Sequence, residues 1–165
     1  MDSNERIIAH IVSVWRESKK FVSIGGREGM LLLTDRHLVF VHKTEAKMKW
    51  WQAVVQRQIV GLLKDKTKNI MQTHDGYSEK DLMLDLENKK NIEISFDDIT
   101  KIDHKEEPWG SALNIEYTKN GQKEKFQFSV VQSWVKYPAK DPQKYMRVDW
   151  EPLVQYIKDR QKLIP

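Results

Sequence analysis

The sequence predicts an α+β fold, in which an antiparallel sheet of about seven strands is closed by a C-terminal helix and interrupted by a two-helix insertion. Three observations predict it. Short apolar runs separated by turn residues occupy 7–42 and 92–130. A helical stripe without proline occupies 44–72. An amphipathic stretch follows Asp149 and reaches almost to the end of the chain.

The first strand is predicted over residues 6–15. Its apolar residues mix period-two and helical spacing, so periodicity alone does not choose between strand and helix: Ile7, Ile8, Ile11, Val12, Val14 and Trp15. The β-branched side chains among them favour a strand. Residues 21–24 follow as a short partner before a turn at Gly25 and Gly26.

Residues 29–42 have the pattern of a β-hairpin. Two apolar runs flank a polar break, and Thr34 and Asp35 in that break supply side-chain oxygens for a turn. The residues predicted to share one face of the hairpin are Leu31, Leu33, Leu38 and Phe40.

The middle of the chain, 43–90, is predicted to be a helical insertion. Apolar residues at spacings of three and four form a stripe: Met48, Trp51, Val55, Ile59 and Leu62. Trp50, Val54 and Leu63 widen this stripe, and Gly61 is a weak point in the helix. Ser78 and Asp81 resemble a capping box at the start of a second helix that runs to about residue 88.

The C-terminal half predicts more strands and the closing helix. Strands are expected at 92–96, 99–103, 113–117 and 126–130, with Asp97-Asp98 and Asn120-Gly121 at turns. Asp149 is a candidate cap for the helix, and Pro152 fits its first turn. The apolar face of this helix is predicted to comprise Trp150, Leu153, Val154, Ile157 and Ile164.

This order of elements resembles the pleckstrin-homology-like and GRAM-like family. The most specific residues are the 29–40 hairpin, the run Ile94-Ser95-Phe96-Asp97-Asp98-Ile99 and the aromatic C-terminal helix. The resemblance covers roughly 5–42 and 91–163, and the insertion lies outside it. It implies a bent antiparallel sheet capped by a helix, and a binding module that is not an enzyme.

Composition bounds the class of protein. A chain of 165 residues with 39% hydrophobic content suits one compact domain, here 1–165 with the insertion inside it. Cysteine is absent, which is compatible with a reducing compartment. The N-terminus is polar, and no apolar run approaches the roughly 20 residues of a membrane span. We therefore expect a cytoplasmic protein, with peripheral membrane contact as an alternative.

The positive charge is concentrated in the insertion. The whole chain has a net charge of +4, from 28 basic and 24 acidic residues. Residues 43–72 contain seven cations against two anions. A local excess of this kind raises the electrostatic potential of one surface and favours an anionic partner.

No catalytic or cofactor motif stands out. The five histidines are scattered, and none forms a metal-binding helix pair with a glutamate between. No Gly-x-Ser-x-Gly elbow is present, and the segment 25–29 lacks the residues of a phosphate-binding loop. We expect no catalytic residue, no metal and no cofactor.

The insertion supplies the predicted partner site, and the expected partner is another protein or a second copy of the chain. Its proposed apolar anchors are Trp50, Trp51, Val55, Ile59 and Leu62, and its basic rim is Lys47, Lys49, Arg57 and Lys64. Such a stripe packs against the chain's own sheet, against the second helix or against a second copy of the chain. Tryptophans flanked by cations also suit an anionic membrane surface. A nucleic acid is disfavoured, since no binding motif for one is present.

The family resemblance adds a second candidate site. Members that hold phosphoinositides use a Lys-x(n)-Lys/Arg-x-Arg pattern near the first strands. Arg16, Lys19 and Lys20 fall near that place, although the terminal arginine of the pattern is missing and Phe21 interrupts it.

Overall fold

The computed structural model describes residues 4–18, 26–42, 58–62, 70–71, 86–87, 89–131 and 145–162. Its strands are β1 (Ile7–Ser18), β2 (Gly26–Thr34), β3 (His37–His42), β4 (Ile92–Ser95), β5 (Ile99–Glu107), β6 (Gly110–Lys119) and β7 (Gln122–Val130). A 3-10 turn, η1 (Phe96–Asp98), joins β4 to β5, and helix α3 (Glu151–Lys162) follows β7. The predicted fold class is confirmed.

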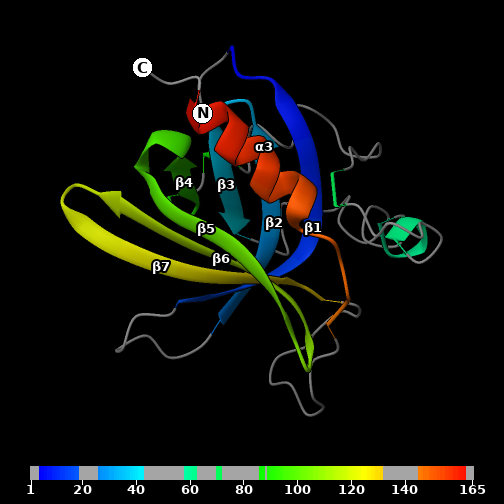
Figure 1. Ribbon diagram of the computed structural model, residues 1–165. Coiled ribbons are helices and arrows are strands. Elements are labelled where there is room, and N and C mark those ends of the chain that lie inside the picture. The colour runs from blue at the N-terminus through cyan, green and yellow to red at the C-terminus, as the bar shows by residue number, and fades with distance from the viewer. Residues whose placement is uncertain are drawn as a thin grey trace.

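All seven strands belong to one antiparallel sheet of order β4-β3-β2-β1-β7-β6-β5. Strand β1 joins the two halves of the sheet, because it pairs with β2 along most of its length and with β7 from Val14 to Ser18. In Figure 1 strands β5–β7 run across β1–β4 at a steep angle, and α3 lies over the upper end of β1–β3. The sheet is therefore bent around a core that α3 closes at one end.

The main core lies between the concave face of the sheet and α3. Leu153, Val154 and Ile157 of the helix are buried there, as their spacing predicted. Trp150, expected on the helix, precedes it and is nonetheless fully buried. The Asp149 cap is confirmed, since Glu151 N donates to Asp149 Oδ1 at 3.0 Å.

The predicted hairpin is formed by β2 and β3. Leu31 pairs with Phe40 and Leu33 pairs with Leu38, all in the main core. Thr34 Oγ1 accepts hydrogen bonds from the backbone N–H groups of residues 36 and 37, at 3.1 and 2.8 Å, as its place in the turn suggested. The second predicted turn is also present, with φ of 52° at Asn120 and 76° at Gly121.

The opposite face of β1–β3 is apolar as well. The alternate residues of the same strands form a second buried group, the outer cluster: Val12, Met30, Leu32, Val39 and Val41. Ile59 and Leu86, both from the predicted insertion, pack against it. Part of the insertion therefore covers a sheet face that would otherwise meet water.

Residues 58–62 are helical, in agreement with the predicted stripe. Leu62 is 1% exposed and belongs to the main core, and Ile59 contacts both clusters. The rest of the two predicted helices lies largely outside the described residues, as does the predicted strand at 21–24. The bounds 43–90 of the insertion and the single-domain division of 1–165 stay predictions.

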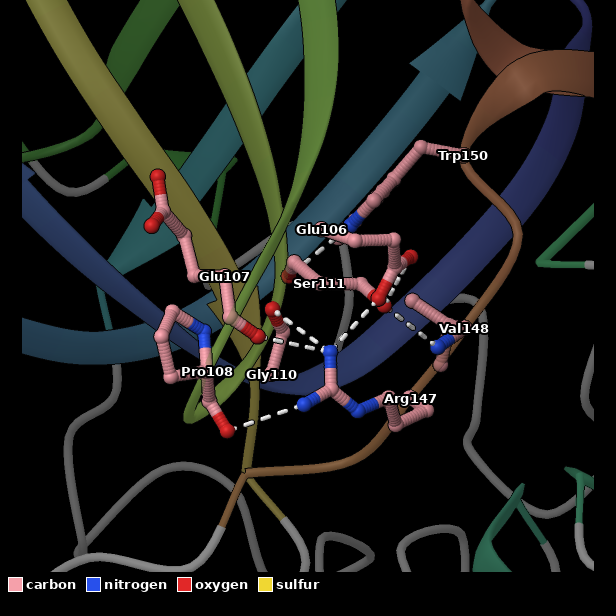
Figure 2. Close-up of polar contacts among 8 residues, drawn as sticks. All are labelled: Glu106, Glu107, Pro108, Gly110, Ser111, Arg147, Val148 and Trp150. Atoms are coloured by element: carbon pink, nitrogen blue, oxygen red, sulfur yellow. Dashed lines mark hydrogen bonds and ion pairs between the residues drawn. The ribbon is translucent and has the colours of Figure 1, made fainter.

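The segment before α3 is tied to the β5–β6 hairpin by Arg147 (Figure 2). Its Nη1 donates to Glu106 Oε2 at 2.7 Å and to Glu107 O at 2.7 Å, and its Nη2 donates to Pro108 O at 2.9 Å. Ser111 adds a second tie, because Val148 N donates to its Oγ at 3.1 Å. These bonds fix where α3 starts.

In the part of the chain described, no helix has the length and apolar character needed to cross a bilayer.

Candidate anion-binding site

Basic side chains lie on the same face of the sheet as the main core, beyond the last apolar residues of that face. Arg16 of β1 pairs with Arg27 of β2, which places both on one face. Arg16 follows Val14 by two residues and His42 follows Phe40 by two, and both apolar residues belong to the main core. This end of the sheet, where β1 ends and β2 begins, lies opposite α3 in Figure 1.

The guanidinium of Arg16 lies over two aromatic rings. Its central carbon is 5.1 Å from the ring centroid of Phe40 and 5.1 Å from that of Phe126. Stacking of this kind favours the charged side chain by about 0.5–2 kcal/mol. It holds the guanidinium against the two rings.

One donor of the Arg16 side chain lacks a partner. Arg16 Nε is buried and has no hydrogen-bond partner. Among the described residues, neither Arg16 nor Arg27 has a carboxylate within ion-pairing distance, and Arg27 Nη1 donates to the carbonyl of Gly26 at 3.0 Å. A buried N–H without an acceptor costs about 1–3 kcal/mol, so this donor favours a ligand that accepts.

The basic side chains repel one another. Burial lowers the pKa of Arg16, and the nearby charge of Arg27 lowers it further. The pKa of His42 is lowered from its usual 6.5 by burial, then by Lys90, Arg16 and Arg27. We call Arg16, Arg27, His42 and Lys90 the basic cluster. An anion placed among them relieves both the repulsion and the missing hydrogen bond.

Of the residues predicted from sequence, Arg16 lies in the basic cluster. Lys19 and Lys20 lie outside the described residues, as do seven residues predicted on the insertion: Lys47, Lys49, Trp50, Trp51, Val55, Arg57 and Lys64. Ile59 and Leu62 are described, and they pack on the chain's own sheet, one of the three alternatives left open for the stripe.

Sequence reasoning missed Arg27, His42 and Lys90. They are far apart in the chain, and the strand pairing brings them together: β2 places Arg27 beside Arg16, and His42 N donates to Asn91 Oδ1 at 2.8 Å, next to Lys90. The available signal was the period of two on β2 and β3, which puts Arg27 and His42 on the core side once the hairpin register is known.

A second polar group surrounds His37, the first residue of β3. Its Nδ1 is 2.8 Å from Glu5 Oε1 and its Nε2 is 3.4 Å from Glu93 Oε1. Thr34 Oγ1 donates to Glu5 Oε2 at 2.7 Å. The three candidate ligand atoms of Glu5, His37 and Glu93 lie within 4.8 Å of one another. The two ring nitrogens face different carboxylates, which is the arrangement of an imidazole bridging two acids rather than of three ligands on one ion.

A shallow cleft of about 410 Å³ lies between β5 and α3. It is lined by Ile99, Thr100, Lys101, Ile102, Asp103, Lys158 and Gln161. Gln161 Nε2 donates to Phe96 O of η1 at 2.9 Å and to Ile99 O at the start of β5 at 3.0 Å. The lining mixes both charges, so the cleft has less selectivity for an anion than the basic cluster.

Comparisons with known proteins give a likeness at the level of the fold. No family model and no curated protein matches the chain. A solved structure, the "Vps36 N-terminal PH domain", is similar over 99% of this chain and 84% of that chain, with a TM-score of 0.49 and 12% identity. A likeness of this size says nothing of ligands or partners. The bent sheet of seven antiparallel strands closed by a C-terminal helix has the architecture of a pleckstrin-homology-like fold.

Proposed function

We propose that this chain is a non-catalytic binding module that takes a phosphate-bearing ligand at the basic cluster. The observation that carries the proposal is the half-buried guanidinium of Arg16, which lies over the rings of Phe40 and Phe126 and whose Nε has no hydrogen-bond partner. Arginine presents a planar set of donors that matches the oxygens of a phosphate. Arg27 and Lys90 add charge around it, and His42 adds a group that becomes cationic when an anion is near.

Two sources of such a ligand share this chemistry: a free phosphate compound and the headgroup of an anionic lipid. Arg16 would contact the phosphate group itself, so this contact does not distinguish between the two sources. Titration with inorganic triphosphate tests the first source. Binding to vesicles of phosphatidylcholine with or without phosphatidylserine tests the second.

The decisive variants are Arg16→Gln and Arg27→Gln, with Lys158→Gln as the control. Arg27 is exposed, so its replacement leaves the core untouched, and Lys158 is an exposed cation on α3 at the far end of the sheet. Loss of one charge-assisted contact is expected to weaken triphosphate binding about tenfold in each arginine variant. The control variant should bind as the native chain does.

Two results would contradict the proposal. One is native-like triphosphate and vesicle binding by both arginine variants. The other is an equal loss in all three variants, which would mean that only the net charge of the protein matters. A chain that binds vesicles but not triphosphate would place the ligand on a lipid.

A protein partner or a second copy of the chain, bound through the insertion, is the second candidate function. Val60 is 45% exposed while its neighbours Ile59 and Leu62 pack inward, so this turn presents an apolar side chain outward. Light scattering over a concentration series tests it, with Trp51→Ala and Val60→Asp as variants. A dimer that either substitution dissolves supports the candidate. A concentration-independent monomer would exclude self-association, and a pull-down that both substitutions leave unchanged would exclude a partner at this surface.

A further inference from the structure

Strand β1 contains a bulge that a side chain from the predicted insertion completes. The register of β1 against β2 shifts between Ile11 and Val14, and Ser13 has a φ of 56°. Val12 N donates to Gln58 Oε1 at 2.8 Å, and Gln58 Nε2 donates to Val12 O at 2.7 Å. Gln58 is 2% exposed. Its amide gives Val12 the two hydrogen bonds that a neighbouring strand would supply.

The hydrogen bonds of Gln58 lie at the point of β1 where its pairing with β7 ends. Strand β7 pairs with β1 from Val14 to Ser18, and Val131 N donates to Ser13 O at 2.8 Å. At the next residue back along β1, Val12, the partner is Gln58 instead of a strand. The bulge is thus held from both sides, by the end of β7 and by the insertion. A residue other than glycine adopts a left-handed φ at a penalty, so the conformation of Ser13 depends on such support.

The bulge decides which face of the sheet Arg16 occupies. Before it, Ile11 faces the main core, and after it Val14 does, although the two are three residues apart. A regular strand keeps a strict period of two, so the extra residue exchanges the faces. Arg16, two residues after Val14, therefore lies over Phe40 and Phe126. In a strand without the bulge it would face the opposite side, and the basic cluster would lose its central residue.

We propose that Gln58 is a positioning residue for Arg16, through which the insertion controls the anion site. This inference rests on the proposed function, because it concerns control of that same site. Binding energy from an anion on Arg16 is linked to the bulge, and the bulge is linked to Gln58. Whatever displaces residues 58–62 therefore weakens anion binding, and an anion in turn stabilises their contact with β1.

The test uses Gln58→Met, which keeps the side-chain length but not the amide, and Gln58→Ala. The side-chain Nε–H signal of Arg16 in a nitrogen-15 correlation spectrum reports its position and is assigned by its loss in Arg16→Lys. We expect both Gln58 variants to shift this signal and to bind inorganic triphosphate roughly tenfold more weakly, while the circular dichroism of the sheet is kept. An unshifted Arg16 signal in folded Gln58→Met would overturn the proposal.

A measurement on the native chain covers the case in which both variants unfold. The amide of Val12 should exchange with solvent as slowly as amides within the β1–β2 ladder, and triphosphate should slow it further. Fast exchange at Val12, or exchange that triphosphate leaves unchanged although the chain binds it, would refute the coupling. Failure of the proposed function looks different: the native chain would then bind no triphosphate, while Gln58→Met would still shift the Arg16 signal.

Discussion

Replacement of Gly29 by alanine tests how tightly β2 packs against β3 and the ring of Phe40. A Cβ at this position would lie 2.4 Å from Val41 O and 2.5 Å from Phe40 Cζ, where ordinary contact begins at 3.4 Å. A gap of about an ångström must therefore open. Neither neighbour yields easily, because Val41 is in the β2–β3 ladder and Phe40 is fully buried. We expect a loss of about 3 kcal/mol in unfolding free energy, at the upper end of the range for overpacked cores.

For a chain of this size, that loss corresponds to a drop in Tm of about 6–12 °C. Thermal and urea unfolding followed by circular dichroism measure it. Gly26→Ala is the matched comparison, since its Cβ would meet the indole of Trp15 at 2.2 Å, and a partly exposed side chain can turn away. That variant should lose less than about 1 kcal/mol. Equal losses in the two variants, or a native Tm for Gly29→Ala, would refute the reasoning from rigid backbone and buried ring.

Three further predictions concern other groups. Arg147→Lys keeps the charge but not the forked contacts of Figure 2. Because the side chain is 53% exposed, we expect the unfolding free energy to fall by only about 1 kcal/mol, which lowers Tm by about 2–4 °C. An unchanged Tm would mean that the contacts are dispensable. Sulfate binding should tighten as pH falls below 6.5, because burial and then Lys90 hold the pKa of His42 down and an anion favours its protonated form. If His42→Gln leaves the dependence of sulfate affinity on pH unaltered, the prediction is contradicted. Burial raises the pKa of Tyr117 and of Tyr145 to about 12. The stability that comes from keeping these two phenols neutral is therefore present below pH 10 and is lost as pH rises through 12. An ultraviolet titration should show both side chains ionising near pH 12, and ionisation near pH 10 would contradict this prediction.

Several elements could be predicted because their causes are local. The oxygen of Thr34 and the positive φ values of Asn120 and Gly121 follow from the chemistry of turn residues. The buried face of α3 follows from its spacing of apolar residues. The hairpin alternation was also predictable, but not that both of its faces are buried. A run such as 30–33 is apolar throughout, and only the presence of Ile59 and Leu86 against the outer cluster explains why.

The basic cluster was less accessible, because it depends on register. Arg16 was singled out from sequence, yet its neighbours Arg27 and His42 become neighbours only through the pairing of three strands. The first strand was ambiguous for a related reason. Its mixture of spacings between Ile7 and Trp15 is what a bulged strand produces, and a search for one fixed period does not recognise it.

The sequence by itself determined the order of strands, the two tight turns and the closing helix, since each arises from contacts within a few residues. Only the tertiary structure decided which charges meet. The two hydrogen bonds between Gln58 and Val12 join residues 46 apart, and with the end of β7 they support the bulge that turns Arg16 toward Phe40 and Phe126. Long-range pairing sets the faces of strands, and the faces of strands bring distant side chains into one site.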